Sequence, residues 1–230
     1  DLAAALDIKI VPMFWGAAFG FELASGYPWG FWAGGNFDLI KEGQERFVKK
    51  TAKLRAHANS LGIRLAHEIH PGTAAMCAEE FGRLVEICDG DKCLGVNADP
   101  SHCWEGEDWE TRFTHPAVRD RVYACHVKNF VVRPGVPLRR MDGNWHNRAM
   151  QFTDLGSGDL NMVRYVEMLI NIGYPARYNK IMGTETAPLI AETESPYRDA
   201  DATAIEGIQY VRDQLCFPVA EGSFEDDMGA

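Results

Sequence analysis

The sequence lacks the features that mark several classes of protein. No stretch concentrates its 23 Lys and Arg residues, and 33 Asp and Glu residues outnumber them to give a formal net charge of −10. Nucleic-acid partners are therefore not expected, because phosphate binding depends on clustered cations. The most apolar window, residues 8–21, contains Lys9 and Pro12 and is shorter than the ~20 residues that span a membrane. No basic residue precedes an apolar run, so we expect no signal peptide, no membrane partner and a cytoplasmic location.

The six cysteines also lack a recognisable pattern. They form neither a Cys-x-x-Cys pair nor a regular spacing, which argues against a zinc knuckle and against a disulfide framework. Free cysteine is among the most buried residue types, so we expect reduced and mostly buried thiols.

What the sequence does contain is an alternation of short apolar strands and amphipathic helices. The predicted strands cover residues 8–14, 63–69, 94–98, 122–127 and 179–184. The predicted helices cover residues 2–6, 47–61, 74–88, 109–121, 160–172 and 202–215. This alternation is typical of an α/β fold with a parallel sheet and outer helices. A chain of 230 residues, 46% of them hydrophobic, is long enough to bury the core of one such domain.

Five strands are fewer than the eight of a closed (β/α)₈ TIM barrel, which typically takes ~250 residues. We therefore expect residues 1–218 to be the C-terminal five βα units of a single TIM barrel domain, with the first three units, roughly 90 residues, absent. Residues 131–158 are rich in Pro, Gly, Arg and Asn and are predicted to be an irregular insertion over one face. Residues 219–230 are predicted to be an acidic, flexible tail.

Side chains that can bind metal lie at the carboxyl ends of four of the predicted strands. They are Glu68 in AHEIHPG, Asp99 in NADPSHCWEG, His126 in ACHVKNF and Glu185 in MGTETA. Because active sites of parallel barrels form at the carboxyl ends of the strands, we expect these four side chains to converge. Each one alone has a simpler explanation, such as a helix cap or a surface charge. Three converging carboxylates would repel one another without a cation, so the group together predicts one divalent metal ion.

The proposed ligand set narrows the choice of metal. Three oxygens and one imidazole nitrogen suit Mn²⁺ best, with Mg²⁺, Co²⁺ and Zn²⁺ as alternatives. His70 and Lys128 each lie two residues beyond a proposed ligand, so their side chains should point into the same cavity and contact substrate.

Tryptophan and arginine residues are frequent in the predicted loops. Trp15 and Trp104, like Trp109 and Trp145, lie in or near loops over the expected mouth, where they could stack on a substrate ring or pack the loops together. Arg139, Arg140 and Arg148 in the insertion could meet a phosphate or carboxylate, although exposed arginine is ordinary.

The motifs resemble those of the sugar phosphate isomerase and epimerase family, within the xylose isomerase-like TIM barrel superfamily. The resemblance extends over about residues 8–215 through EIHPG, NADPSHCWEGED, CHVKNF, LGSGDL and INIGY. It implies that the four side chains Glu68, Asp99, His126 and Glu185 bind the metal, and that His102 contacts substrate. The sequence departs from the family where Asn129 replaces an Asp, and where TETAP replaces an acidic run around the last proposed ligand.

This resemblance predicts a divalent-metal-dependent sugar isomerase or epimerase. The reaction removes a proton from a carbon next to a carbonyl, and a metal that chelates the adjacent oxygens stabilises the enediolate. Glu68 and Glu185 would flank the substrate as the two bases, and His102 would polarise or protonate a substrate oxygen. The expected partners are a small sugar or glycoside substrate and further copies of the chain in a homo-oligomer.

Three other functions stay open. The catalytic subunit of carbon-glycoside deglycosidases resembles the same family, acts by metal-dependent elimination on a 3-oxo-glycoside and requires a second small subunit. A phosphodiesterase like the apurinic-site endonucleases needs an Asp-x-His pair after His126, which the sequence lacks, and a cationic surface. A non-catalytic sugar-binding module would not need four metal ligands.

Overall fold

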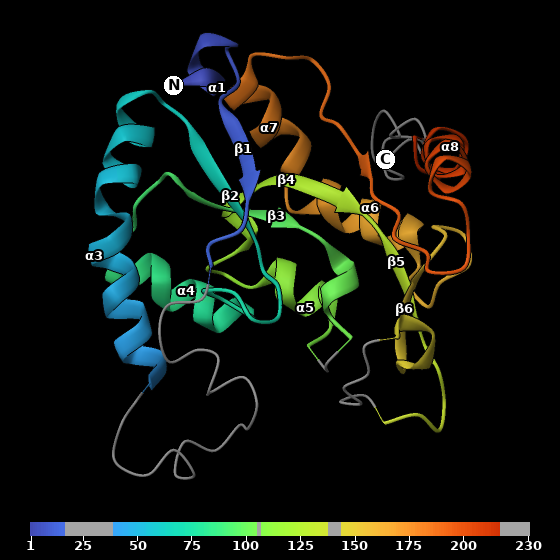
Figure 1. The fold of residues 1–230 in the computed structure, drawn as a ribbon. Helices are drawn as coiled ribbons and strands as arrows, with labels where there is room; N and C mark the ends of the chain where they lie inside the picture. Colours follow the sequence, from blue (N-terminus) through green and yellow to red (C-terminus); the bar gives the residue numbers. More distant parts are fainter. Residues whose placement is uncertain (17–38, 105–106, 138–143, 217–230) are drawn as a thin grey trace, which may run out of the picture.

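The computed structural model describes residues 1–16, 39–104, 107–137 and 144–216. Five parallel strands form one curved sheet in the order β1-β2-β3-β4-β7 (Figure 1). They are β1 (Ile10–Met13), β2 (Arg64–Glu68), β3 (Leu94–Ala98), β4 (Val122–Val127) and β7 (Ile190–Ala191). The prediction of five parallel strands from an α/β barrel is confirmed for the described part of the chain.

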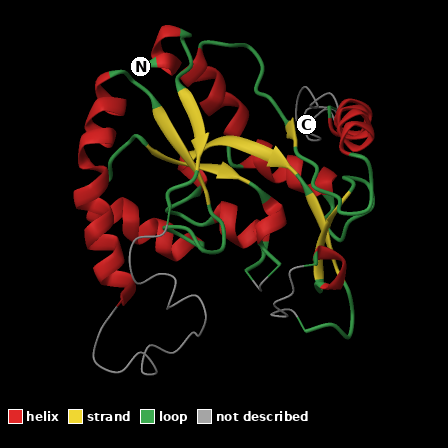
Figure 2. Cartoon of the chain, in the orientation of Figure 1, coloured by secondary structure: helices red, strands yellow, loops and turns green. Residues whose placement is uncertain are grey.

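Helices connect these strands and pack around the sheet (Figure 2). They are α1 (Leu2–Ala5), α3 (Leu39–Ser60), α4 (Ala78–Ile87), α5 (Trp109–Thr114), α6 (Met162–Asn171), α7 (Tyr174–Met182) and α8 (Ala200–Tyr210). Shorter turns of helix are η2 (Pro100–His102), η3 (Arg119–Arg121), η4 (Trp145–Asn147) and η5 (Val211–Leu215). Within the four described ranges, no helix has the length and apolar character that crossing a membrane requires.

Alternation along each strand separates the two faces of the sheet. Leu94, Val96 and Ala98 of β3 lie in the main hydrophobic core beneath the helices. Asn97, between the last two, points to the other face because successive strand residues face opposite sides. Four of the six cysteines are buried, as predicted, and all six are free within the described residues.

The predicted strand over residues 179–184 is wrong, because helix α7 occupies most of this segment. Gly173 and Gly183 both adopt positive φ, 74° and 72°, at its two ends, which glycine does without steric cost. Tyr178, Ile181 and Met182 of α7 pack against a small buried cluster on the sheet. A short apolar run does not distinguish such a buried helix face from a strand. The fifth strand lies further along the chain, where Ile190 of β7 pairs with His126 of β4.

The insertion is more regular than predicted. Strand β5 (Asn129–Val132) pairs antiparallel with β6 (Met150–Thr153) in a separate two-stranded sheet. Phe130, Met150 and Phe152 of this hairpin form a hydrophobic cluster with Trp104. The predicted tail over residues 219–230 lies outside the described residues.

Candidate metal centre and cavity

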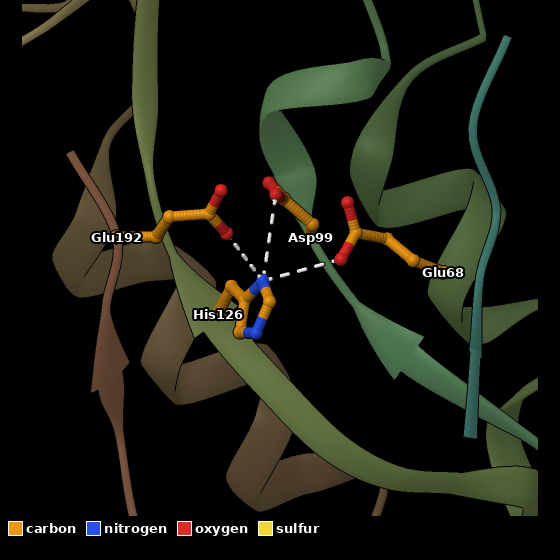
Figure 3. Close-up of side chains that lie close together, drawn as sticks. All are labelled: Glu68, Asp99, His126 and Glu192. Atoms are coloured by element: carbon orange, nitrogen blue, oxygen red, sulfur yellow. Dashed lines mark ion pairs between the residues drawn. The ribbon is translucent and has the colours of Figure 1, made fainter. Parts of the chain in front are cut away.

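Four side chains meet where strands β2, β3, β4 and β7 end (Figure 3). One candidate ligand atom each of Glu68, Asp99, His126 and Glu192 lies within 4.8 Å of the others. His126 Nδ1 lies 2.6 Å from Glu192 Oε2, 3.2 Å from Glu68 Oε2 and 3.8 Å from Asp99 Oδ2. Parallel strands bring these side chains together from distant parts of the sequence because their carboxyl ends share one edge.

The fourth carboxylate of this cluster is Glu192 and not the predicted Glu185. Glu185 is exposed and follows α7, where its carbonyl oxygen accepts a hydrogen bond from Asn179 Nδ2. The error follows directly from the misplaced strand, since the first acidic residue after the true strand is Glu192. Two signals could have identified it: the apolar run APLIA precedes Glu192, whereas TETAP around Glu185 departs from the family pattern.

Two carboxylate oxygens of the cluster are buried without a hydrogen bond to any described residue, namely Asp99 Oδ2 and Glu192 Oε2. Both oxygens lie in ion-pair range of imidazole nitrogens: Glu192 Oε2 lies 2.6 Å from His126 Nδ1, and Asp99 Oδ2 lies 3.3 Å from His102 Nε2. A buried oxygen without a hydrogen bond costs about 1–3 kcal/mol, which a cation bound to both oxygens would offset. A divalent cation with metal–oxygen distances of ~2.0–2.6 Å holds its ligands at most ~5 Å apart. The cluster therefore fits one divalent metal ion.

The surrounding cations keep the three carboxylates ionised. The contact with His126 is the main reason that the pKa of Glu192 falls to about 2, with burial opposing it and Lys128 assisting. Burial raises the pKa of Asp99, but His102 and His126 outweigh it and hold this pKa well below its usual range. The same balance of burial against the two imidazoles lowers the pKa of Glu68. Metal binding requires this deprotonated state.

The pKa values of the two histidines beside these carboxylates, His102 and His126, are raised. His102 Nε2 lies 3.0 Å from Glu68 Oε1 and 3.3 Å from Asp99 Oδ2. Burial lowers the pKa of His102, but these two carboxylates outweigh it and raise the pKa to about 9. Burial also lowers the pKa of His126, while Asp99, Glu192 and Glu68 raise it to about 12. The carboxylates thus attract positive charge, and a bound metal ion would supply it as an imidazolium does.

Neighbouring side chains orient the candidate ligands. Asn97 Nδ2 donates to Glu68 Oε2 at 2.9 Å. Lys128 Nζ, nearly fully buried, lies 2.7 Å from Glu192 Oε1 and 3.1 Å from Glu194 Oε1. Such hydrogen-bonded neighbours fix the direction of metal ligands and tune their basicity.

A cavity of about 530 Å³ opens beside the cluster, a size typical of small-molecule sites. Of the predicted substrate contacts, His70, His102, Lys128 and Trp104 line this cavity. The remaining lining residues are Phe14, Glu68, Pro71, His126, Trp145, Arg148, Met150, Phe152, Glu192 and Glu194. Sequence reasoning missed Glu192, Glu194 and the apolar side chains of the hairpin, because they depend on the positions of β7 and β6.

Trp15, one of the predicted substrate contacts, does not line the cavity. Trp15 is 5% exposed and packs edge-to-face on Phe47 of α3, with ring centres 5.2 Å apart. Trp109 likewise packs on Tyr165. The cavity wall holds Trp145, whose ring lies 4.1 Å from the guanidinium of Arg148, while residues 139 and 140 lie outside the described part.

Comparison with known proteins identifies the same architecture. The family model described as xylose isomerase-like TIM barrel matches residues 1–214. Comparison of the sequence with curated proteins gives no match. Among solved structures, the probable 3-DHS dehydratase AsbF from Bacillus anthracis aligns with a TM-score of 0.61 and 16% identity, over 93% of this chain and 66% of that chain.

Two further structures are similar to a comparable degree. A xylose isomerase-like TIM barrel protein from Mycobacterium smegmatis in complex with magnesium aligns with a TM-score of 0.55 and 19% identity, over 92% of this chain and 62% of that chain. The 3-keto-D-glucoside 4-epimerase YcjR from E. coli aligns with a TM-score of 0.54 and 15% identity, over 92% of this chain and 67% of that chain. The chain therefore spans about two thirds of the length of these structures, and the likeness concerns the fold.

Proposed function

Because the chain belongs to the xylose isomerase-like TIM barrel family, we propose that it is part of a divalent-metal-dependent enzyme that isomerises or epimerises a sugar by proton transfer next to a carbonyl. One observation carries the proposal: three carboxylates and an imidazole converge beside a cavity of small-molecule size. Two of the carboxylate oxygens are buried without a hydrogen bond from the described residues, which is the expected state of ligands to a cation.

Glu68, Asp99, His126 and Glu192 would hold the metal ion. When bound, such an ion polarises a substrate carbonyl and stabilises the negative charge that develops on its oxygen. Mn²⁺ is our first choice for three oxygens and one nitrogen, and the magnesium in the Mycobacterium smegmatis structure supports a metal of this class.

The remaining chemistry is proton transfer by the protein's own side chains. Glu68 and Glu192 approach His126 from two sides and both line the cavity, so they are placed to remove a proton from substrate carbon and to return it (Figure 3). His102 lines the cavity and would donate a hydrogen bond to a substrate oxygen. His70, Lys128 and Trp104 would contact the remaining hydroxyls and the ring.

Deuterium exchange tests this function whichever net reaction the enzyme catalyses. The protein with added Mn²⁺ is incubated with a panel of ketoses in D₂O, and deuterium on carbon is measured by NMR. We expect exchange that a chelator abolishes and that Glu192→Gln abolishes as well. Glu185→Gln changes an exposed carboxylate near by in sequence and should leave the exchange rate unchanged. Exchange that survives the chelator, or the loss of Glu192, would contradict the proposal.

The apolar part of the cavity favours a second candidate, elimination from a 3-oxo-glycoside. Phe14, Trp145, Met150 and Phe152 form a wall that could contact the group leaving the sugar. The similar fold of the 3-keto-D-glucoside epimerase adds a related substrate class. A 3-oxo-glucoside in the same D₂O assay separates the two reactions, because epimerisation retains the glycosidic bond and elimination releases the alcohol. The predicted homo-oligomer is tested separately by light scattering of the purified protein.

A further inference from the structure

A buried arginine behind the cavity holds a loop that forms part of its wall. Arg112 of α5 is 3% exposed and extends its guanidinium to the loop between β2 and α4. Its Nη1 donates to the carbonyl oxygen of Ile69 at 3.3 Å, and its Nη2 donates to that of Met76 at 3.2 Å. One side chain thus joins both ends of the loop. Between these ends lie His70 and Pro71, which line the cavity.

The charge of this arginine is balanced inside the same network. Glu107 accepts a hydrogen bond from Arg112 Nε at 2.5 Å, and its other oxygen accepts one from the backbone N–H of Ala78, the first residue of α4. A buried ion pair is tolerated when its remaining donors and acceptors are satisfied, as they are here. The planar guanidinium offers several donors in a fixed fork, which the single ammonium of lysine cannot reproduce.

The loop places the His70 ring through short backbone contacts. His70 Nδ1 donates to the carbonyl oxygen of Pro71 at 2.7 Å, and its ring centre lies 4.0 Å from that of His102. Thr73 Oγ1 donates to the carbonyl oxygen of His70 at 2.7 Å, and the N–H of Ala74 donates to that of Trp15 at 3.0 Å. A change in the loop backbone therefore moves the His70 ring relative to the cluster.

We propose that Arg112 is a positioning residue for substrate: by fixing the ends of the loop it holds His70 against the cavity. The candidate metal ligands lie at the ends of hydrogen-bonded strands, so their geometry depends on this clamp less than the loop does. The expected signature is a weaker affinity for sugar at nearly unchanged affinity for metal. The sugar readout rests on the proposed function, whereas the position of His70 does not.

The chain offers a matched control at the other end of the sheet. Arg121 also donates to backbone carbonyl oxygens, those of Gly90, Asp91 and Leu94, at 2.8, 2.7 and 2.9 Å. These carbonyl groups lie at the N-terminal end of β3, away from the cavity. Arg112→Met and Arg121→Met should therefore both lower the Tm, but only the first should affect the site.

Three measurements on Arg112→Met, Arg112→Lys and Arg121→Met test the proposal. The Nδ1–H signal of His70 in ¹⁵N–¹H NMR should shift or disappear in both Arg112 variants and persist in Arg121→Met. The KM for the sugar in the exchange assay should rise about tenfold with a smaller change in kcat, while calorimetric affinity for Mn²⁺ stays within about threefold. Arg112→Lys keeps the positive charge but loses the planar set of guanidinium donors. If Arg112→Met does not fold, the measurements on Arg112→Lys test the positioning role.

A His70 signal and KM that match the wild type in the folded Arg112 variants would overturn the proposal and leave Arg112 a purely structural residue. If no sugar undergoes exchange in any variant, the proposed function fails, but the His70 signal still supports or refutes the positioning role.

Discussion

The two ends of the parallel sheet each hold an aspartate carboxylate, and the two carboxylates differ in how completely they are hydrogen-bonded. Before β3, the carboxylate of Asp91 accepts hydrogen bonds from Arg55 Nη1 at 2.6 Å, Asn59 Nδ2 at 2.7 Å and the N–H of Cys93 at 3.0 Å. After β3, Asp99 is 1% exposed, yet its Oδ2 accepts no hydrogen bond from the described residues. Side-chain and backbone donors satisfy the first carboxylate, whereas Oδ2 of the second lies only in ion-pair range of His102 and His126, at 3.3 and 3.8 Å.

We therefore expect Asp91, before β3, to contribute to stability and Asp99, after β3, to contribute to function. In parallel barrels, catalytic residues gather at the carboxyl end, and the opposite end contributes to stability. Burial raises the pKa of Asp91, but Asn59, the Cys93 N–H and Arg55 together lower it, so this carboxylate stays ionised without any ligand. Mutations at the two ends should therefore produce different signatures.

The largest expected effect is the loss of metal binding in Asp99→Asn. Removing one charged ligand of four should lower the affinity for Mn²⁺ at least about 1,000-fold, equivalent to about 4 kcal/mol. Because a ligand that binds only the folded state stabilises it, Mn²⁺ should raise the Tm of the wild type and leave that of Asp99→Asn unchanged. Calorimetric titration and thermal melts with and without Mn²⁺ measure both quantities. Equal metal affinity in wild type and variant would show that Asp99 is not a ligand.

Asp91→Asn should have the opposite signature. The variant leaves buried Arg55 without its carboxylate partner, and breaking such a pair costs about 3 kcal/mol. Urea denaturation should show this loss in the free energy of unfolding, while the affinity for Mn²⁺ stays as in the wild type. If Asp91→Asn weakened metal binding as strongly as Asp99→Asn, the two ends of the sheet would not be separable.

The sequence predicted three of the four clustered side chains, because Glu68, Asp99 and His126 lie at the carboxyl ends of strands whose short apolar runs are bounded by clear turn signals. Glu192 escaped prediction because α7 presents an apolar run of its own, and local pattern does not show which run pairs with β4. The burial of Trp15 depends on its contact with Phe47 of α3, a residue distant in sequence. The role of Arg112 depends on carbonyl oxygens, which every residue possesses and no sequence pattern marks.

His67 precedes Glu68 at the carboxyl end of β2, yet both of its ring nitrogens have partners within the protein. It is completely buried on the opposite face of β2, where its Nδ1 accepts the N–H of Trp15 at 3.1 Å and its Nε2 faces the carbonyl oxygen of Ala75 at 3.4 Å. This pairing requires the neutral ring. Burial is the main reason that the pKa of His67 falls from 6.5 to about 4.

The smallest expected effect is therefore a pH dependence of stability that His67 contributes. Between pH 6.5 and 4 the unfolded chain binds a proton at this ring that the folded protein excludes, so the stabilisation is complete above pH 6.5 and declines as the pH falls towards 4. From pH 7 to pH 4.5 the loss should be about 2 kcal/mol. Urea denaturation of wild type and His67→Gln at both pH values isolates the contribution of His67 to the free energy of unfolding, because the carboxylates titrate in both proteins. The variant should lose less stability than the wild type over this interval, and equal losses would mean that His67 is not held neutral.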